Sequence, residues 1–212
     1  RRYIPLITKA VELVSEIGKI TQVEGRFYKN SSPAFYSGCA SAFTCDVVHV
    51  TDLVRHIAGG KPIKAVTLET SSSADGLADS WHSIIRFDSG VTSVIRSHYA
   101  TGGRVHEFEI HTKGASAFIN LGFGVQGCSA RILYSGGGKQ SLSAKGLDGT
   151  SVIDLDGIEI AGSGRYEDYY GYRDEDRIFV EKLLSGATVD PERLNEDFAT
   201  AELVETLLNA KI

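Results

Sequence analysis

The sequence predicts an α+β fold, in which helices pack on one face of a single large, mostly antiparallel open sheet. Three observations support this. A helix, a strand and a second helix come first, a series of short strands joined by tight turns follows, and the C-terminal part returns to helical periodicity. With 212 residues, 42% of them hydrophobic, the chain can bury a substantial core. We expect one domain over residues 1–212.

The N-terminal part begins with an amphipathic helix over Pro5–Glu16. A proline just inside the start of a helix loses no hydrogen bond, because the first N–H groups of a helix have no partner within it. Gly18 follows and ends the helix. Residues 20–28 then alternate between polar and apolar or small side chains, which is typical of a strand. A loop of small residues over Phe35–Phe43 leads into a second helix over Cys45–His56, which ends at Gly59.

Short β-rich runs separated by turn residues make up the middle of the chain. They cover residues 64–70, 80–87, 91–99, 105–112, 115–121 and 129–134. The turns Asp88-Ser89-Gly90 and Lys113-Gly114 predict tight hairpins, so the strands on either side should be antiparallel. The segment 135–164 is rich in Gly and Ser, and within it Ser151–Leu155 and Ile158–Ile160 are expected to form one more hairpin.

Two amphipathic helices are predicted for the C-terminal part. The first covers Asp174–Leu184 and stops at Gly186, and the second covers Pro191–Leu208. Their apolar positions are Ile178, Phe179, Leu183 and Leu184 in the first, and Leu194, Phe198, Leu203 and Leu207 in the second. No internal repeat interrupts this order of elements.

The second helix carries an unusual concentration of titratable groups. At about 100° per residue, Cys45, His49, Asp52 and His56 share one narrow arc, and valines and leucines occupy the other side. A carboxylate next to an imidazole fixes its tautomer and raises its proton affinity, as a general base for an alcohol proton requires. The same stripe is also what the polar face of any amphipathic helix looks like. A metal site is a further alternative, although no CxxC or HExxH pattern supports it.

Composition excludes several classes of function. The formal charge of −5 and the pI near 5.7 provide no basic surface for nucleic acid. Neither a long apolar run nor a signal-peptide pattern is present, so no membrane association and a cytoplasmic location are expected. Three cysteines, Cys39, Cys45 and Cys128, are an odd number at uninformative spacings, which argues against a disulfide framework. The absence of methionine indicates a fragment or a processed form.

Two glycine motifs do not support nucleotide binding in this chain. Residues 122–127 match GxGxxG, with Asp148 at the spacing of a ribose ligand, but the motif works only where it opens a helix. Here a short β-rich run follows, too short for a crossover helix. Gly138-Lys139 fails as a P-loop, because Leu133 and Gln140 occupy positions that need Gly and Ser or Thr.

Several of these features together resemble a known family. They are Arg1-Arg2-Tyr3 before a proline-initiated helix, the strand Ile20–Tyr28, the Asp46-x-x-His49-x-x-Asp52 helix, and the strands around the Lys113-Gly114 hairpin. In this order the chain resembles the C-terminal domain of glucose–fructose oxidoreductase, inositol dehydrogenase and rhizopine-catabolism (Gfo/Idh/MocA) type oxidoreductases. The resemblance covers essentially the whole sequence.

The resemblance implies a two-domain enzyme whose N-terminal Rossmann domain, absent from this chain, binds NAD or NADP. The present domain, of the dihydrodipicolinate-reductase-like C-terminal type, is then expected to form the wall of a sugar or polyol site. It is also expected to form a homodimer or homotetramer through its open sheet face. No cofactor-binding residue and no metal ligand are expected within this chain, and the fragment alone should be inactive.

The resemblance also implies roles for particular residues. His49 matches the general base or proton relay of the family, with Asp46 or Asp52 as the carboxylate that orients it. The family's usual catalytic Asp lies four residues before this His, where Cys45 stands here. Asp46, three residues before His49, matches a variant of that pattern, so the departure leaves its role open.

Substrate contacts are implied for Arg1, Tyr28, Lys29, Tyr99 and Arg104. Arg1 could equally be a terminal charge, and a tyrosine at the end of a strand is often half-buried packing. Four tyrosines at positions 166, 169, 170 and 172 either line the rim of the cleft or belong to a surface loop.

Two other functions are compatible with the sequence. One is a catalytically silent binding or oligomerisation module of the same fold, in which Cys45 marks a lost active site. The other is an independent ligand-binding domain that uses the concave sheet, which predicts a large apolar pocket within this chain.

Overall fold

A computed structural model describes the chain except for residues 32–40, 73–75, 123–126, 136–148 and 187–190. Its elements are α1 (Pro5–Ile17), β1 (Ile20–Asn30), η2 (Phe43–Val47), α2 (Val48–Ala58), β2 (Pro62–Thr70), β3 (Ser80–Phe87), β4 (Thr92–His98), β5 (Ala100–Thr112), β6 (Ala115–Leu121), β7 (Cys128–Tyr134), β8 (Ser151–Asp156), α3 (Gly157–Ala161), α4 (Tyr166–Tyr169), α5 (Tyr172–Leu184) and α6 (Pro191–Asn209). Within the described residues the strands form one eight-stranded sheet of order β2-β3-β4-β1-β5-β6-β7-β8.

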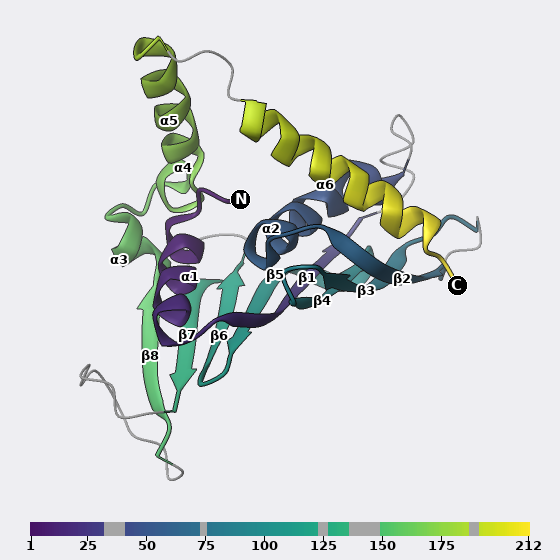
Figure 1. The fold of residues 1–212 in the computed structure, drawn as a ribbon, viewed down its shortest axis with the longest axis horizontal. Coiled ribbons are helices and arrows are strands. Elements are labelled where there is room, and N and C mark those ends of the chain that lie inside the picture. Colours follow the sequence, from purple (N-terminus) through teal and green to yellow (C-terminus); the bar gives the residue numbers. More distant parts are fainter. Residues whose placement is uncertain (32–40, 73–75, 123–126, 136–148, 187–190) are drawn as a thin grey trace.

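The predicted fold class is confirmed. Every pair of neighbouring strands is antiparallel except β1 and β4, which are parallel. Helices α1, α2 and α6 lie on one face of the sheet, and in the described part of the chain the other face carries no helix (Figure 1). The two predicted hairpins are also confirmed, because β3 pairs with β4 and β5 pairs with β6.

Strand β1 positions helix α2. Val23 and Phe27 are buried on the helix side of the strand, as alternation predicts. Between them, Gly25 leaves room for the helix, since a Cβ at this position would lie 2.4 Å from Val50 Cγ2 and 3.0 Å from Val54 Cγ2. The helix therefore packs directly on the strand backbone, and this close approach fixes where its polar residues lie.

The second helix differs from the regular α-helix that the sequence predicts. Residues Phe43–Val47 form a π-helix, and α2 begins only at Val48. A π-turn holds more residues than an α-turn, so the 100° wheel does not apply to its first part. Asp46 is buried, whereas His49 is exposed. The predicted stripe of Cys45, His49, Asp52 and His56 thus begins in the π-helix and continues into α2, and the buried Asp46 lies outside it.

One predicted hairpin is wrong. Ser151–Asp156 forms β8 as expected, but Gly157–Ala161 is the helix α3 rather than a return strand. Asp156 causes the difference, because its carboxylate accepts hydrogen bonds from the backbone N–H groups of Ile158 at 2.8 Å and Glu159 at 3.0 Å. An aspartate in this position is a strong helix N-cap.

The tail helices form as predicted but bury little of their apolar surface. In the C-terminal half of α6, Leu203, Val204 and Leu207 pack into the core. By contrast, Leu194 and Phe198 of α6 and the apolar residues of α5 are not buried. After α6 the chain pairs with strand β2, where Thr67 N–H donates to Ala210 O at 2.8 Å.

The cysteines also differ from expectation. Cys45 is disulfide-bonded. Cys128 is free and buried, and burial raises its pKa to about 11. Among the described residues, no helix combines the length and apolar character needed to cross a membrane.

Candidate functional site

A buried carboxylate stands at the centre of the candidate site. Asp46, in the π-helix η2, accepts hydrogen bonds at Oδ2 from the ammonium of Lys29 and from the hydroxyl of Tyr99, the latter at 2.8 Å. Lys29 comes from the end of β1 and Tyr99 from the turn after β4, whose strands are parallel neighbours. The two donors hold the carboxylate in one orientation. Sequence reasoning named all three residues, and the structure brings them together.

His49 lies nearby on the accessible side of helix α2. It lines a cavity of about 340 Å³ together with residues of the N-terminus, α5 and α6. Partial burial lowers its pKa, the positive charge of Arg1 lowers it further, and the charge of Asp46 opposes both effects. The imidazole is therefore neutral at neutral pH and able to accept a proton. Among the described residues, none forms a hydrogen bond with the ring.

Asp52 has hydrogen-bond partners other than His49. Its carboxylate is held by both Arg2, through Nε at 2.9 Å and through Nη2, and by the Thr200 hydroxyl at 2.7 Å. Burial opposes its ionisation, but these hydrogen bonds outweigh burial and lower its pKa. Asp52 thus joins the N-terminus, α2 and α6. Its predicted catalytic role stays a prediction.

A buried histidine that sequence reasoning missed lies next to this cluster. His106 is only 1% exposed, and its ring stacks on Phe27 with 4.3 Å between centroids. Nε2 accepts from Arg104 Nε at 3.3 Å, so in the neutral ring the proton is on Nδ1, which lies 3.1 Å from the Tyr170 hydroxyl. Burial, then the charges of Arg1 and Arg104, lower the pKa of His106 to about 2.

The same network accounts for two further predicted residues. Arg1 donates from Nη1 to the Tyr170 hydroxyl at 2.7 Å, and its guanidinium lies 5.1 Å from the centre of that ring. Arg104 is held by His106. The signal for His106 was in the sequence, since it shares an inward-facing alternation with Phe108 and Ile110.

Tyr28 is a predicted contact that the structure places elsewhere. It follows the buried, helix-facing Phe27 on β1, so by alternation it points to the uncovered face of the sheet. The tyrosine cluster is divided as well: Tyr169 and Tyr170 are buried, whereas Tyr166 and Tyr172 are exposed. The alternative metal set loses a ligand, because the sulfur of Cys45 is in a disulfide.

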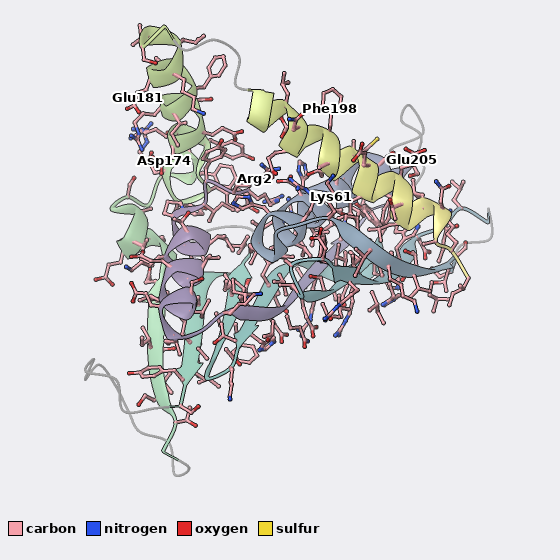
Figure 2. The ribbon with its side chains drawn as sticks, viewed as in Figure 1. Arg2, Lys61, Asp174, Glu181, Phe198 and Glu205 are labelled. Atoms are coloured by element: carbon pink, nitrogen blue, oxygen red, sulfur yellow. The ribbon has the colours of Figure 1, made fainter. Side chains whose placement is uncertain are left out.

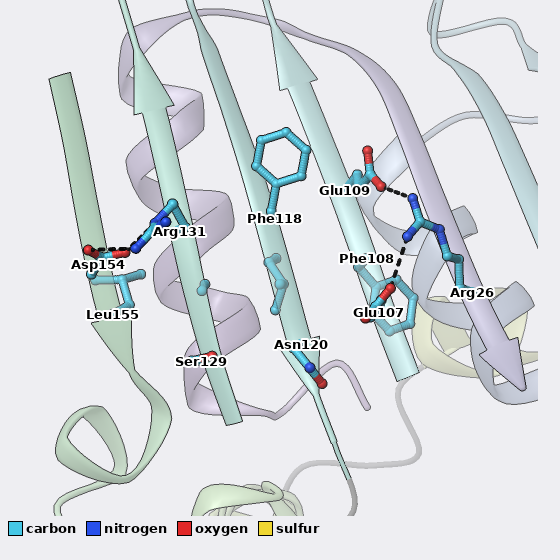
Figure 3. Close-up of a pocket in the computed structure, with 12 residues that line it drawn as sticks. Arg26, Glu107, Phe108, Glu109, Phe118, Asn120, Ser129, Arg131, Asp154 and Leu155 are labelled. Carbon is cyan, nitrogen blue, oxygen red and sulfur yellow. Dashed lines mark hydrogen bonds and ion pairs between the residues drawn. The ribbon is translucent and has the colours of Figure 1, made fainter. Parts of the chain in front are cut away.

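The uncovered sheet face holds a groove of about 510 Å³ (Figure 3). On one side Arg26 pairs with Glu107 at 3.0 Å and with Glu109, and on the other Arg131 pairs with Asp154 at 2.7 Å. Phe118 lies between these ion pairs (Figure 3). This charged lining differs from the large apolar pocket that an independent ligand-binding domain predicts.

Glu24, Glu109 and His111 are also close enough on this face to share a cation. However, Arg96 binds Glu24 at 2.9 Å and Arg26 binds Glu109, so arginine already neutralises these carboxylates.

The fold and the site define an α+β domain with one large, mostly antiparallel sheet and a polar cluster at the start of a helix that packs on the central strands. The family model for the GFO/IDH/MocA C-terminal domain matches residues 7–118. The chain therefore belongs to this family, as the resemblance predicted.

Solved structures agree with this fold. The chain is similar to UDP-N-acetylglucosamine 3-dehydrogenase from Acidithiobacillus ferrooxidans, with 15% identity, a TM-score of 0.70, and coverage of 99% of this chain and 61% of that chain. The chain is also similar to levoglucosan dehydrogenase in complex with NADH and L-sorbose. The identity is 14% and the TM-score is 0.74, with coverage of 99% of this chain and 61% of that chain. A third similar structure is a putative myo-inositol dehydrogenase from Sinorhizobium meliloti 1021. The identity is 18% and the TM-score is 0.65, with coverage of 99% of this chain and 60% of that chain.

The chain thus spans about 60% of the length of these structures. At these identities the likeness supports the fold alone. A search of curated proteins finds no significant match.

Proposed function

We propose that the chain is the substrate-binding and oligomerisation domain of an NAD- or NADP-dependent oxidoreductase that acts on CH–OH groups of a sugar, a polyol or a related hydroxy compound. The observation that carries the proposal is a buried carboxylate, Asp46, which accepts two hydrogen bonds and whose negative charge acts on the accessible imidazole of His49 in the cavity wall. This combination can take a proton from a hydroxyl group as the carbon that bears it is oxidised.

His49 is the proposed base. Its neutral ring would accept the hydroxyl proton in the cavity that it lines. The negative charge of Asp46 raises the pKa of His49, and this effect stabilises the imidazolium once the proton has moved. Lys29 and Tyr99 hold that carboxylate in place through their hydrogen bonds, and both are also proposed as substrate contacts.

The cofactor is proposed to be bound mainly by another domain. The GxGxxG motif at residues 122–127 is followed by strand β7, which begins at Cys128, and not by the helix that a dinucleotide site requires. When bound, a nicotinamide supplies the hydride acceptor or donor, and the residues of this chain position the hydroxyl group and handle its proton.

The sugar or polyol class is supported by the relatives, which include dehydrogenases of UDP-N-acetylglucosamine and levoglucosan. Arg1 and Arg104 are proposed as further polar contacts for substrate. Oligomerisation is proposed through the uncovered sheet face. The cytoplasmic location predicted from the sequence remains a prediction, and the disulfide of Cys45 is more typical of an oxidising compartment.

The test measures the dehydrogenase activity of the longest natural protein that contains this sequence. A panel of sugars and polyols is supplied as substrates, and the absorbance of the nicotinamide reports turnover. In His49→Ala we expect kcat to fall about 10²–10⁴-fold, the usual contribution of a general base. His56→Ala, an exposed histidine of the same helix, is the control and should retain activity.

Full activity in His49→Ala would remove the proposed role. A wild-type protein that assembles and binds sugar without any turnover would instead favour the catalytically silent module.

A further inference from the structure

The hydroxyl group of Tyr170 joins two donors of a buried hydrogen-bond network. Arg1 Nη1 donates to it at 2.7 Å, and His106 Nδ1 lies 3.1 Å from it. Because His106 Nε2 accepts from Arg104 Nε at 3.3 Å, the proton of the neutral ring is on Nδ1. Nδ1 is therefore a donor as well, and the Tyr170 oxygen accepts two hydrogen bonds.

These two hydrogen bonds leave the proton of the Tyr170 hydroxyl unused. A phenolic oxygen has two lone pairs to accept with and one proton to donate, and both lone pairs are occupied here. Tyr170 is only 5% exposed, and among the described residues no acceptor for its proton is found. A buried donor without an acceptor is costly, so we expect an acceptor from outside the chain at this point.

Arg1 brings a positive charge to the same place without a carboxylate to balance it. Its guanidinium lies 5.1 Å from the centre of the Tyr170 ring, and its Nε is buried with no hydrogen-bond partner. In the described part of the chain, no carboxylate lies within ion-pair distance of Arg1. A partly buried cation is stabilised by a counter-ion, and here a bound ligand can supply one.

The neighbouring cations already have acidic partners. Arg2, which lies on the same side of the sheet as α6 (Figure 2), pairs with Asp52 and, at 3.9 Å, with Asp197. Lys29 pairs with Asp46. Arg1 lines the cavity that also holds His49, so its charge remains available to a compound that enters this cavity.

We propose that Arg1 and Tyr170 form a subsite for an anionic group, a carboxylate or a phosphate, of the compound that binds beside His49. The oxygens of such a group accept the Tyr170 proton and pair with the guanidinium, so one ligand group satisfies both residues. The inference rests on the proposed function and narrows its substrate class to a sugar acid or a sugar phosphate. A neutral polyol can accept the proton but cannot balance the charge.

His106 is a positioning residue in this subsite. Its Nδ1–H occupies one lone pair of the Tyr170 oxygen, and this fixes the direction in which the hydroxyl proton points. Burial, with the charges of Arg1 and Arg104, lowers the pKa of His106 to about 2, so the ring keeps this arrangement at neutral pH.

Calorimetric titration of the longest natural protein that contains this sequence tests the proposal. NADH is present in excess, so that any nucleotide site is already filled. The ligands are inorganic phosphate, gluconate and, as the neutral counterpart of gluconate, glucitol. We expect at least one of the two anions to bind more tightly than glucitol. Tighter binding of gluconate identifies a carboxylate subsite, and tighter binding of phosphate identifies a phosphate subsite.

Substitutions locate this binding. Arg1→Gln should weaken anion binding at least about tenfold, and Tyr170→Phe about tenfold, because each removes a donor to a charged group. Arg1→Lys keeps the charge and should retain more affinity than Arg1→Gln. Arg165→Gln is the matched control, since it removes a cation that is 64% exposed and paired with Glu167, and it should bind anions as the wild type does.

Glu175 gives an independent test from the opposite charge. It lines the same cavity, so its carboxylate repels an anion bound there. Glu175→Gln should therefore strengthen anion binding, and unchanged or weaker binding in this variant would place the anion elsewhere.

The proposal fails if neither anion binds to the wild type, or if Arg1→Gln binds both as well as the wild type does. The turnover panel for the proposed function separates the two levels. Oxidation of neutral sugars without anion binding rejects the subsite alone. Anion binding at Arg1 without any turnover rejects the proposed function alone.

Discussion

At the scale of single residues, the candidate site is defined by which groups already have partners. Asp46 is held by Lys29 and Tyr99 and acts on His49 through its charge, whereas Asp52 is occupied by Arg2 and Thr200. The resemblance named Asp46, Lys29 and Tyr99 one by one as site residues, although Tyr99 lies 53 residues from Asp46 along the chain. The occupation of Asp52 could not be predicted, since Thr200 lies 148 residues away along the chain.

His106 predicts a particular pH dependence of stability. Its pKa is about 2 in the folded protein and returns to about 6.5 on unfolding, so only the unfolded chain binds this proton at mildly acidic pH. Its contribution to stability is complete above pH 6.5 and is lost as the pH falls towards 2. At pH 5.5 the expected loss is about 1.4 kcal/mol.

Urea unfolding at pH 7.5 and 5.5 measures this difference. Between pH 7.5 and pH 5.5, the free energy of unfolding of His106→Gln should fall by about 1.4 kcal/mol less than that of the wild type. His82→Gln, which removes an exposed imidazole, should retain most of it. If His106→Gln loses as much stability on acidification as the wild type does, the buried imidazole is not the cause.

At the scale of elements, local patterns predicted the strands well and the special turns poorly. Strands β3 and β6 have the predicted bounds, because alternation and turn residues are properties of the sequence itself. The π-turn before α2 carries no comparable signal, so an α-helical wheel that starts at Cys45 does not indicate the burial of Asp46. Similarly, the N-cap at Asp156 outweighed the β-branched residues that follow it.

Packing of α2 on β1 makes a prediction at this scale. Gly25→Ala would place a methyl group 2.4 Å from Val50 Cγ2, so the helix must move, at a cost of about 1–3 kcal/mol. Gly102→Ala is a matched control, because no atom lies within 4 Å of its added Cβ. Thermal unfolding should show a lower Tm only for Gly25→Ala. An unchanged Tm in that variant would mean that α2 does not rest on the strand as described.

At the scale of the whole molecule, the sheet separates two surfaces with different tasks. One face holds the helices and the candidate site, and the other carries ion pairs around Phe118 (Figures 1 and 3). The sequence indicated the sheet and its alternation, but not which apolar residues of the tail helices stay exposed. That depends on how distant elements are brought together, as for the exposed Phe179 on α5 and Phe198 on α6.

Oligomerisation through the uncovered face predicts a role for Phe118. Phe118→Lys should weaken self-association at least about tenfold, because it places a charge between the ion pairs at the centre of the proposed interface. Ile17→Lys is matched in exposure, since both side chains are 39% exposed, but it lies at the end of α1. Light scattering after size exclusion gives the mass of each variant. Equal masses for Phe118→Lys and the wild type would place the interface elsewhere.

The pairing of the C-terminal residues with β2 has a consequence for solubility. Strand β2 is at one edge of the sheet, and an uncovered edge presents unpaired backbone groups on which a strand of another molecule can assemble. Thr67 instead bonds to Ala210 and accepts the N–H of Ile212 at 3.0 Å. Residues 210–212 thus cover this edge and protect it against aggregation. This role is unrelated to catalysis and depends on backbone hydrogen bonds alone.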